Sequence, residues 1–189
     1  MRKKSLNNKE PREEALRQQI VGLFPRFRRF ARGLTRDPDR ADDLVQAACE
    51  RALERLDQYR EGTRIDSWMY RIIYTRWIDE VRKDKTRTAN LVVLANDDNF
   101  KSDSNQAGTQ LNRSLDIHRA LEALSEEHRA AIMLVSVEGY SYTEASTVLN
   151  VPVGTVASRV ARARTQLGKL LARKPHHRAQ PSRQAKGER

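Results

Sequence analysis

The stretch "SYTEASTVLNVPVGTVASRVARARTQL", Ser141–Leu167, contains two amphipathic segments separated by a short turn. Ser141, with Glu144 three positions later, forms a capping box that predicts a helix over 142–149. The residues Asn-Val-Pro at 150–152 predict a tight turn, and a second helix is expected over 153–171. A short helix, a turn of three or four residues and a longer helix together make a helix-turn-helix arrangement.

The second of these helices contains three arginines and no acidic residue between Val153 and Leu167. If Val156 and Val160 face the core, the outward side chains are those of Thr155, Ser158, Arg159 and Arg162. In a helix-turn-helix the second helix enters the major groove, where arginine can bind guanine through two hydrogen bonds. A solvated basic face is the alternative, but the cap, the turn and the apolar register agree with DNA binding.

The rest of the chain also has helical periodicity. Apolar residues recur every three or four positions from Leu16 to Leu34, with Pro25 predicting a kink or a break. Asp37 followed by Pro38 predicts a helix start with an apolar stripe from residue 41 to 56. A third helix is expected over 68–85, capped by Asp66 or Ser67.

A fourth helix is expected to begin after Ser125 and to end at Gly139 in a left-handed conformation. No segment outside the linker alternates with period two, so the predicted fold class is all-α. The division by composition gives a mobile basic tail at 1–11, a helical domain at 12–85, a polar linker at 86–112, a second helical domain at 113–172 and another mobile basic tail at 173–189.

The overall charge indicates a polyanionic partner, because 36 lysines and arginines against 25 acidic residues give a net charge of +11. Nucleic acid is the first candidate and an anionic membrane surface the second. No apolar run of about 18 residues and no apolar leader is present, which predicts a cytoplasmic protein without membrane insertion. Cys49 lies at an apolar helical spacing and is expected in the core. No metal-ligand spacing, phosphate loop or nucleophile motif is found, so no metal, cofactor, catalytic residue or enzymatic activity is expected.

Three strings carry a resemblance to a known family. "VPVGTVASRVARARTQL" at 151–167 resembles the recognition helix of the extracytoplasmic-function group of bacterial σ factors, and "RADDLVQAACERALERLDQY" with "SWMYRIIYTRWIDEVRK" resembles that group's region 2. The resemblance covers about residues 24–85 and 117–171. It implies a promoter-specificity subunit with σ regions 2 and 4 that recruits core RNA polymerase, through its β′ and β subunits, and melts promoter DNA.

The resemblance implies a polymerase-binding face on the "DDLVQ" helix, made by Asp42, Asp43, Gln46 and Glu50. In the family this polar face docks on a coiled coil of the β′ subunit. The i, i+4, i+8 spacing of the first, third and fourth of these residues places them on one side of a helix. A solvated acidic face fits that spacing equally well, and Ala47 stands where the family often has Glu.

The loop "YREGTRIDSW" at 59–68 matches the family's loop that captures a base flipped from the promoter element nearest the start site. The residues that the resemblance implies for capture are Arg60, Arg64, Ser67 and Trp68, and those for phosphates are Arg71, Arg76, Arg82 and Lys83. Trp68 can also be read as a core aromatic. Thr75 and Ala157 depart from the Asn and Lys that many relatives have at these positions.

The family also implies an anti-σ partner that wedges between or covers the two domains. The motif sequences favour relatives that control stress-responsive genes. The alternative is a stand-alone helix-turn-helix regulator that binds duplex DNA without being a polymerase subunit. A response-regulator receiver domain would show alternating strands and helices, and the N-terminal half shows none. A basic RNA-binding or membrane-surface protein is a more remote alternative, without a stacking motif or a suitable amphipathic helix.

Overall fold

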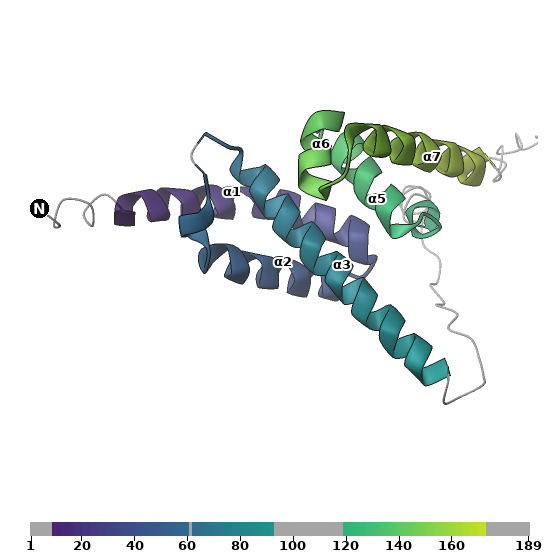
Figure 1. Ribbon diagram of the computed structural model, residues 1–189, viewed down its shortest axis with the longest axis horizontal. Coiled ribbons are helices and arrows are strands. Elements are labelled where there is room, and N and C mark those ends of the chain that lie inside the picture. The colour runs from purple at the N-terminus through teal and green to yellow at the C-terminus, as the bar shows by residue number, and fades with distance from the viewer. Residues whose placement is uncertain (1–8, 61, 93–118, 173–189) are drawn as a thin grey trace, which may run out of the picture.

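The computed structural model describes residues 9–60, 62–92 and 119–172, and within these ranges all regular structure is helical (Figure 1). The all-α prediction is therefore confirmed. Residues 93–112 of the expected linker lie outside the described residues, as do residues 1–8 and 173–189 of the two expected tails. None of the described helices combines the length and the apolar character needed to cross a membrane.

Helix α1, Lys9–Thr35, runs through Pro25 without ending, so the expected break is wrong. It also begins inside the segment 1–11 that composition assigned to a tail. Proline removes the hydrogen bond to the carbonyl four residues earlier, which belongs to Val21. Val21 is 65% exposed, so water can satisfy that carbonyl. Beyond the proline, Phe27 and Phe30 are fully buried and anchor the second half of α1 in the core.

Helix α2, Pro38–Leu53, begins as its sequence predicts. The Asp37 side chain accepts hydrogen bonds from the backbone N–H groups of Asp39 and Arg40, and Pro38 occupies the first helical position. Its buried face consists of Ala41, Leu44, Val45, Ala48 and Ala52. Cys49 is half-buried against the core, and burial raises the pKa of its thiol. A single 3-10 turn, η1 at Leu56–Gln58, follows.

Helix α3, Ile65–Val92, is longer at both ends than the expected 68–85. It starts before Asp66 and Ser67, so neither residue is its N-cap. At the other end it takes in residues 86–92 of the expected linker. This stretch contains no Gly or Pro to stop the helix, and the hydroxyls of Thr86 and Thr88 donate to the carbonyls one turn back.

We call α1 to α3 the N-terminal domain. The ring of Tyr70 in α3 lies at its centre, edge-on to Phe27 at 5.4 Å and to Phe30 at 4.9 Å between ring centroids. Trp77 of the same helix is also buried. Together these aromatics fix the angle at which α3 crosses α1.

The C-terminal domain comprises α5, Glu126–Ile132, α6, Tyr142–Leu149, and α7, Val153–Ala172. Ser125 caps α5 and Gly139, with φ of +75°, ends the segment, both as predicted. Between them the helix widens into a π-helical segment, η2 at Met133–Val137, which the sequence did not indicate. The capping box of Ser141 and Glu144 is present and α6 has the predicted bounds.

The helix-turn-helix is thus confirmed, with its turn closed by Asn150 in the left-handed conformation. Val156 and Val160 of α7 are buried against the domain core, as the apolar register predicts.

The two domains pack against each other rather than standing apart (Figure 1). One continuous cluster of buried residues contains members of both. Tyr70 of α3 and Tyr140 before α6 meet edge-on with ring centroids 5.5 Å apart. Met133 of η2 rests directly on Gly33 of α1. We call this arrangement the closed conformation.

Candidate nucleic-acid interface and polymerase-binding face

The loop before α3 and the first turns of that helix form a pocket of about 440 Å³, here called the loop pocket. The residues that line it are Gln58, Arg60, Thr63, Arg64, Ser67, Trp68, Arg71 and Thr147. All four residues that the resemblance implies for base capture are therefore brought together, along with one of the phosphate candidates. Thr147 comes from α6, so the C-terminal domain supplies part of the wall.

Arg64 is the most heavily engaged side chain of the loop pocket. Its guanidinium donates to both Asp66 carboxylate oxygens, at 3.1 and 2.7 Å, and to Oε1 of Glu144 at 2.6 Å. It also lies over the Tyr140 ring, 4.7 Å from the centroid. Burial by itself would raise the pKa of Asp66, but the Arg64 guanidinium and the Ser67 N–H hold it below its usual value.

Trp68 combines the two roles considered for it. It is half-buried, with its ring centroid 5.6 Å from that of Tyr59, and it still contributes to the wall of the loop pocket. The Tyr59 hydroxyl donates to the carbonyl of Thr63 and so ties the two sides of the loop together. The pocket therefore has a rigid aromatic side and a cationic side.

The phosphate candidates occupy α3 at different levels of exposure. Arg71, Arg82 and Lys83 are exposed along the helix. Arg76 is half-buried, and its Nε atom is buried without a hydrogen-bond partner.

The four predicted residues of the recognition helix are not equally accessible. Ser158 and Arg162 are exposed, whereas Thr155 and Arg159 are half-buried. Nη1 of Arg159 is buried and lacks a hydrogen-bond partner. Burial raises the pKa of Tyr74 in α3, and the neighbouring Arg159 charge opposes that rise. Arg159 is therefore only partly exposed, and Tyr74 of the N-terminal domain lies beside it in the closed conformation.

The expected polymerase-binding residues lie on the outer side of α2. Asp43, Gln46 and Glu50 are exposed, and Gln46 donates to Glu50 at 3.1 Å. Asp42 instead receives two hydrogen bonds from Arg28 of α1, which holds the pKa of its carboxyl below the usual value. The free negative charge of this face therefore comes from Asp43 and Glu50.

Glu138 is a residue whose importance the sequence did not indicate. Its side chain has no exposed surface, and it accepts hydrogen bonds from Arg26, Arg29 and Tyr70 of the N-terminal domain at 3.2, 3.0 and 2.5 Å. Burial, reinforced by the Glu138 carboxylate, raises the pKa of the Tyr70 hydroxyl. The only local signal was an acidic residue placed just before Gly139, which resembles an ordinary helix end.

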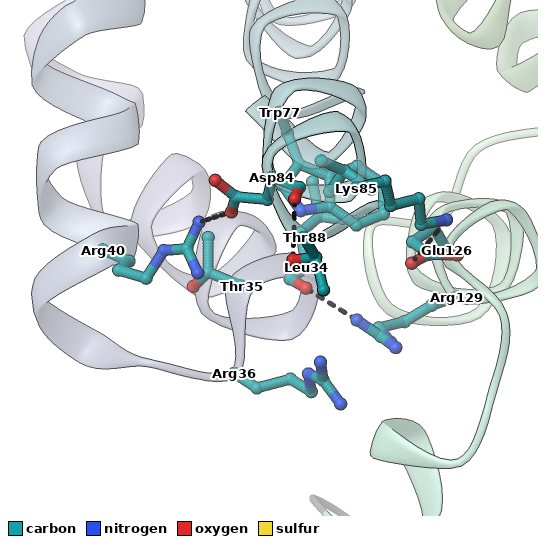
Figure 2. Close-up of a pocket in the computed structure, with 11 residues that line it drawn as sticks. Leu34, Thr35, Arg36, Arg40, Trp77, Asp84, Lys85, Thr88, Glu126 and Arg129 are labelled. Carbon is teal, nitrogen blue, oxygen red and sulfur yellow. Dashed lines mark hydrogen bonds and ion pairs between the residues drawn. The ribbon is translucent and has the colours of Figure 1, made fainter. Parts of the chain in front are cut away.

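Arg129 is the second buried charge that sequence reasoning missed (Figure 2). It donates to the carbonyls of Leu121 and Leu124 in its own domain, at 2.9 and 2.8 Å, and to that of Leu34 in α1 at 2.7 Å. Burial lowers its pKa to about 10, and the charge of Arg36 adds to this. Arg129 therefore satisfies carbonyl groups at helix ends in both domains.

Arg129 also lines a second pocket of about 600 Å³ between the domains. Two ion pairs cross or border this pocket, Arg40 with Asp84 at 2.9 Å and Lys85 with Glu126 at 3.2 Å (Figure 2). Within the described ranges no cluster of three or more His, Cys, Asp or Glu side chains is suited to a metal ion.

Comparison with known proteins agrees with this two-domain organisation. Residues 22–87 match the family Sigma-70 region 2, and residues 114–167 match the family Sigma-70, region 4. The chain is 33% identical over 162 residues to the ECF RNA polymerase sigma factor EcfG of Rhodopseudomonas palustris, covering 85% of this chain and 87% of that one. It is 35% identical over 144 residues to the ECF RNA polymerase sigma factor SigM of Mycobacterium tuberculosis, covering 76% and 70%.

Among solved structures, the sigma factor RpoE of Bartonella quintana, in complex with the anti-sigma factor NepR, is similar with a TM-score of 0.70. The sequence identity is 27%, and the match covers 86% of this chain and 99% of that one. Two helical domains, a loop pocket ahead of α3 and a helix-turn-helix define the class as a two-domain σ factor. This chain belongs to the family of ECF RNA polymerase σ factors. Its function is that of a σ factor in transcription initiation, and the alternative of a stand-alone helix-turn-helix regulator is not supported.

Proposed function

We propose that this σ factor uses three separate surfaces, one for core RNA polymerase and two for promoter DNA. The first is the exposed side of α2, where Asp43, Gln46 and Glu50, with Asp42 beside them, meet the β′ coiled coil, while the β subunit completes the docking of the protein. These short polar side chains lie opposite the buried stripe of α2, so a partner can contact them without disturbing the core.

The second surface is the loop pocket, and its assembly from four implied residues is the observation that carries the proposal. Unstacking a base costs a few kcal/mol, which a pocket with stacking and cationic groups can offset. Trp68 and Arg60 supply such groups, and the exposed cations of α3, among them Arg71 and Lys83, lie along the path of the phosphates. Arg82 is a further exposed cation of α3, and the half-buried Arg76 is the remaining phosphate candidate.

The third surface is the outer face of α7, with Arg162 and Ser158 reading the upstream promoter element and Thr155 and Arg159 joining them when the domains separate. An arginine that binds guanine through two bonds contributes about 1–3 kcal/mol of discrimination.

Regulation is the further part of this proposal. The similarity to a σ factor solved with the anti-sigma factor NepR supports an anti-σ partner for this chain. The σ factor itself directs transcription of stress-responsive genes and acts in the cytoplasm. The protein acts without a cofactor, metal or catalytic residue of its own, and is an initiation factor rather than an enzyme.

The polymerase-binding face is tested with Asp43→Lys. Reversing this exposed charge should leave the fold intact, because surface changes usually shift stability by only about 0.5 kcal/mol, while core binding and run-off transcription fall together. Glu14→Lys makes the same charge change on an exposed part of α1 and is the matched control. Equal core binding by both variants would move the docking face elsewhere.

The two DNA surfaces are separated by a crossed pair of variants in the polymerase-bound protein. Arg60→Ala should weaken binding to premelted promoter DNA more than to upstream duplex, because Arg60 lines the loop pocket and lies outside the recognition helix. Arg162→Ala should do the reverse. Salt dependence should be steep for both probes, since each is held largely by phosphates. Equal losses on both probes would show that neither residue belongs to the surface assigned to it.

A further inference from the structure

The pocket between the two domains, here called the inter-domain pocket, is lined by more cations than carboxylates. It has a volume of about 600 Å³ and lies among the end of α1, the start of α2, the second half of α3, and α5 (Figure 2). A cavity of this size is in the range that small organic ligands occupy. Its four cations and two carboxylates leave a net charge of +2, and these residues are Arg36, Arg40, Asp84, Lys85, Glu126 and Arg129.

Both carboxylates of the inter-domain pocket already have cationic partners. Asp84 accepts a hydrogen bond from Arg40 at 2.9 Å, and the Glu126 carboxylate lies 3.2 Å from Nζ of Lys85. The net positive charge of the pocket therefore comes from the other two cations, which are arginines.

These two arginines, Arg36 and Arg129, reach toward each other from opposite domains (Figure 2). Arg36 donates to the carbonyl of Glu122 at 3.4 Å, and Arg129 donates to the carbonyls of Leu121 and Leu124. Carbonyl groups are neutral, so these bonds do not cancel the two charges. Burial and the charge of Arg36 both lower the pKa of Arg129, and the effect of Arg36 exceeds that of either neighbouring carboxylate. An anion between the two guanidinium groups would relieve this repulsion.

The backbone of Arg36 gives a second indication. This residue directly follows α1 and has φ of 67°, in the left-handed region. The residue at such a helix end is commonly glycine and sometimes asparagine. An arginine there is strained, and strain of this kind concentrates at ligand sites. The side chain of Arg36 therefore has a use that its backbone position does not explain.

The opposite side of the inter-domain pocket is apolar, with Leu34, Trp77 and Val81 in its lining. The planar forks of guanidinium groups match the geometry of phosphate oxygens. A phosphomonoester carries a charge of about −1.5 to −2 at pH 7, which would balance the net charge of the pocket. The apolar lining can hold the organic part of such a molecule.

We propose that the inter-domain pocket binds a small organic phosphate, whose phosphate oxygens contact Arg36 and Arg129 and whose organic part lies against Trp77 and Val81. This site goes beyond the proposed function, because none of its lining residues belongs to the surfaces assigned to polymerase or promoter DNA. Both domains supply its walls, so the ligand binds the closed conformation.

Arg36→Asn is the first test variant. It removes the guanidinium, while asparagine tolerates the left-handed backbone of this position better than arginine does. Arg87→Asn makes the same change of charge at an exposed position of α3 outside the pocket and is the matched control.

Thr88→Glu is the second test variant, because it places a carboxylate in the lining of the pocket. Thr86→Glu is its control, two residues earlier and outside that lining. Both threonines are exposed, and each hydroxyl donates to the carbonyl one turn back at 2.9 Å. The two variants therefore change α3 in the same way and differ in the position of the added charge.

The probe is adenosine 5′-monophosphate, which joins a phosphomonoester to an aromatic base, with adenosine and inorganic phosphate as its separate parts. Isothermal titration calorimetry on the full-length protein gives the affinity and the stoichiometry. In isotope-labelled protein, the NMR signal of the Trp77 indole N–H reports on the inter-domain pocket and that of Trp68 on the loop pocket. A Trp68→Phe variant assigns the two signals.

We expect one molecule of adenosine 5′-monophosphate per chain, a shift of the Trp77 signal, and weaker binding of adenosine and of inorganic phosphate. Arg36→Asn and Thr88→Glu should each weaken binding about tenfold or more, as the loss of a charge-assisted hydrogen bond implies. Arg87→Asn and Thr86→Glu should bind like the wild type.

Three results would overturn the inference. The first is an unchanged Trp77 signal at millimolar nucleotide, including a shift confined to Trp68. The second is equal weakening by Arg36→Asn and Arg87→Asn, which would show attraction to the net charge of the protein alone. The third is binding of inorganic phosphate as tight as that of the nucleotide, which would exclude a role for the apolar lining.

Discussion

At the scale of single residues, Asn150 ends α6 with φ of 54°, in the left-handed region that side chains with a Cβ atom usually avoid. This conformation lets the N–H groups of Asn150 and Val151 both bond the carbonyl of Ser146. The direction in which α7 leaves the turn, and so the direction of the recognition helix, depends on it.

Asn150→Ala should therefore lower the free energy of unfolding by about 1 kcal/mol, because alanine lacks the local hydrogen bonding that makes asparagine tolerable there. Asn150→Gly should be nearly neutral, since glycine adopts positive φ freely. Urea unfolding followed by circular dichroism measures both. An alanine variant as stable as the glycine variant would show that the left-handed turn is not retained in solution.

The buried charges show what sequence reasoning cannot reach at this scale. Ser125, Asp37 and Ser141 could be identified as caps because a cap and its partners lie within three residues of each other. Arg129 and Glu138 could not, because the partners that they bind across the domain interface lie 68 to 112 residues away in the chain. The local sequence around a buried arginine that bonds three carbonyls does not differ from that around an arginine on a surface helix.

At the scale of helices, Pro25 destabilises α1 locally through a missing backbone hydrogen bond, and the buried aromatic side chains of the core offset this loss. Pro25→Ala should restore one hydrogen bond to the carbonyl of Val21 and raise the free energy of unfolding by about 1–3 kcal/mol. Chemical denaturation measures the change, with Gly22→Ala on the same helix as a comparison expected to give at most about 1 kcal/mol. A loss of stability in Pro25→Ala would mean that the packing of α1 requires proline at this position.

Helix ends were predicted well where capping chemistry marks them and poorly where none does. The bounds of α6 agree with the sequence, because a capping box and a turn enclose it. α3 overran its predicted end, since polar Thr, Arg and Asn residues read as linker although none of them stops a helix. Likewise the residues of the loop pocket followed from the family resemblance, whereas the covering of Arg159 depends on how the two domains pack, which no local pattern indicates.

At the scale of the whole molecule, acid should open the closed conformation. The pKa of Glu144 is lowered by its hydrogen bonds from Ser141 and Arg64, and that of Asp66 is lowered by Arg64 and Ser67 despite the opposing effect of burial. Of the groups that lower these pKa values, Arg64 acts on Glu144 and Tyr140 acts on Asp66 across the domain interface. Through these two contacts the carboxylates stabilise the closed form fully above their ordinary pKa values and lose that effect as the pH falls through the lowered ones.

We therefore expect a constant radius of gyration from pH 8 to about pH 5 and an expansion below the ordinary Asp value of 3.8, with Arg26, Arg64 and Tyr140 as the groups facing these carboxylates. Glu144→Gln keeps the capping box but not the titration, so its expansion should depend less on pH. Circular dichroism distinguishes domain separation from loss of helix. A radius that changes between pH 8 and pH 5 would contradict this assignment.

The length of α3 has a consequence for how easily the C-terminal domain returns once it has left. The loop pocket lies at the first turns of this 28-residue helix, which is about 42 Å long at 1.5 Å per residue, and the chain continues toward the C-terminal domain from its last turn. The C-terminal domain is thus attached at the end of α3 that lies farthest from the loop pocket. Because the C-terminal domain is attached at this distant point, the effective concentration of the Glu144 carboxylate near Arg64 is lower than a short connection would give. Return of the C-terminal domain to the loop pocket after separation is therefore less favoured.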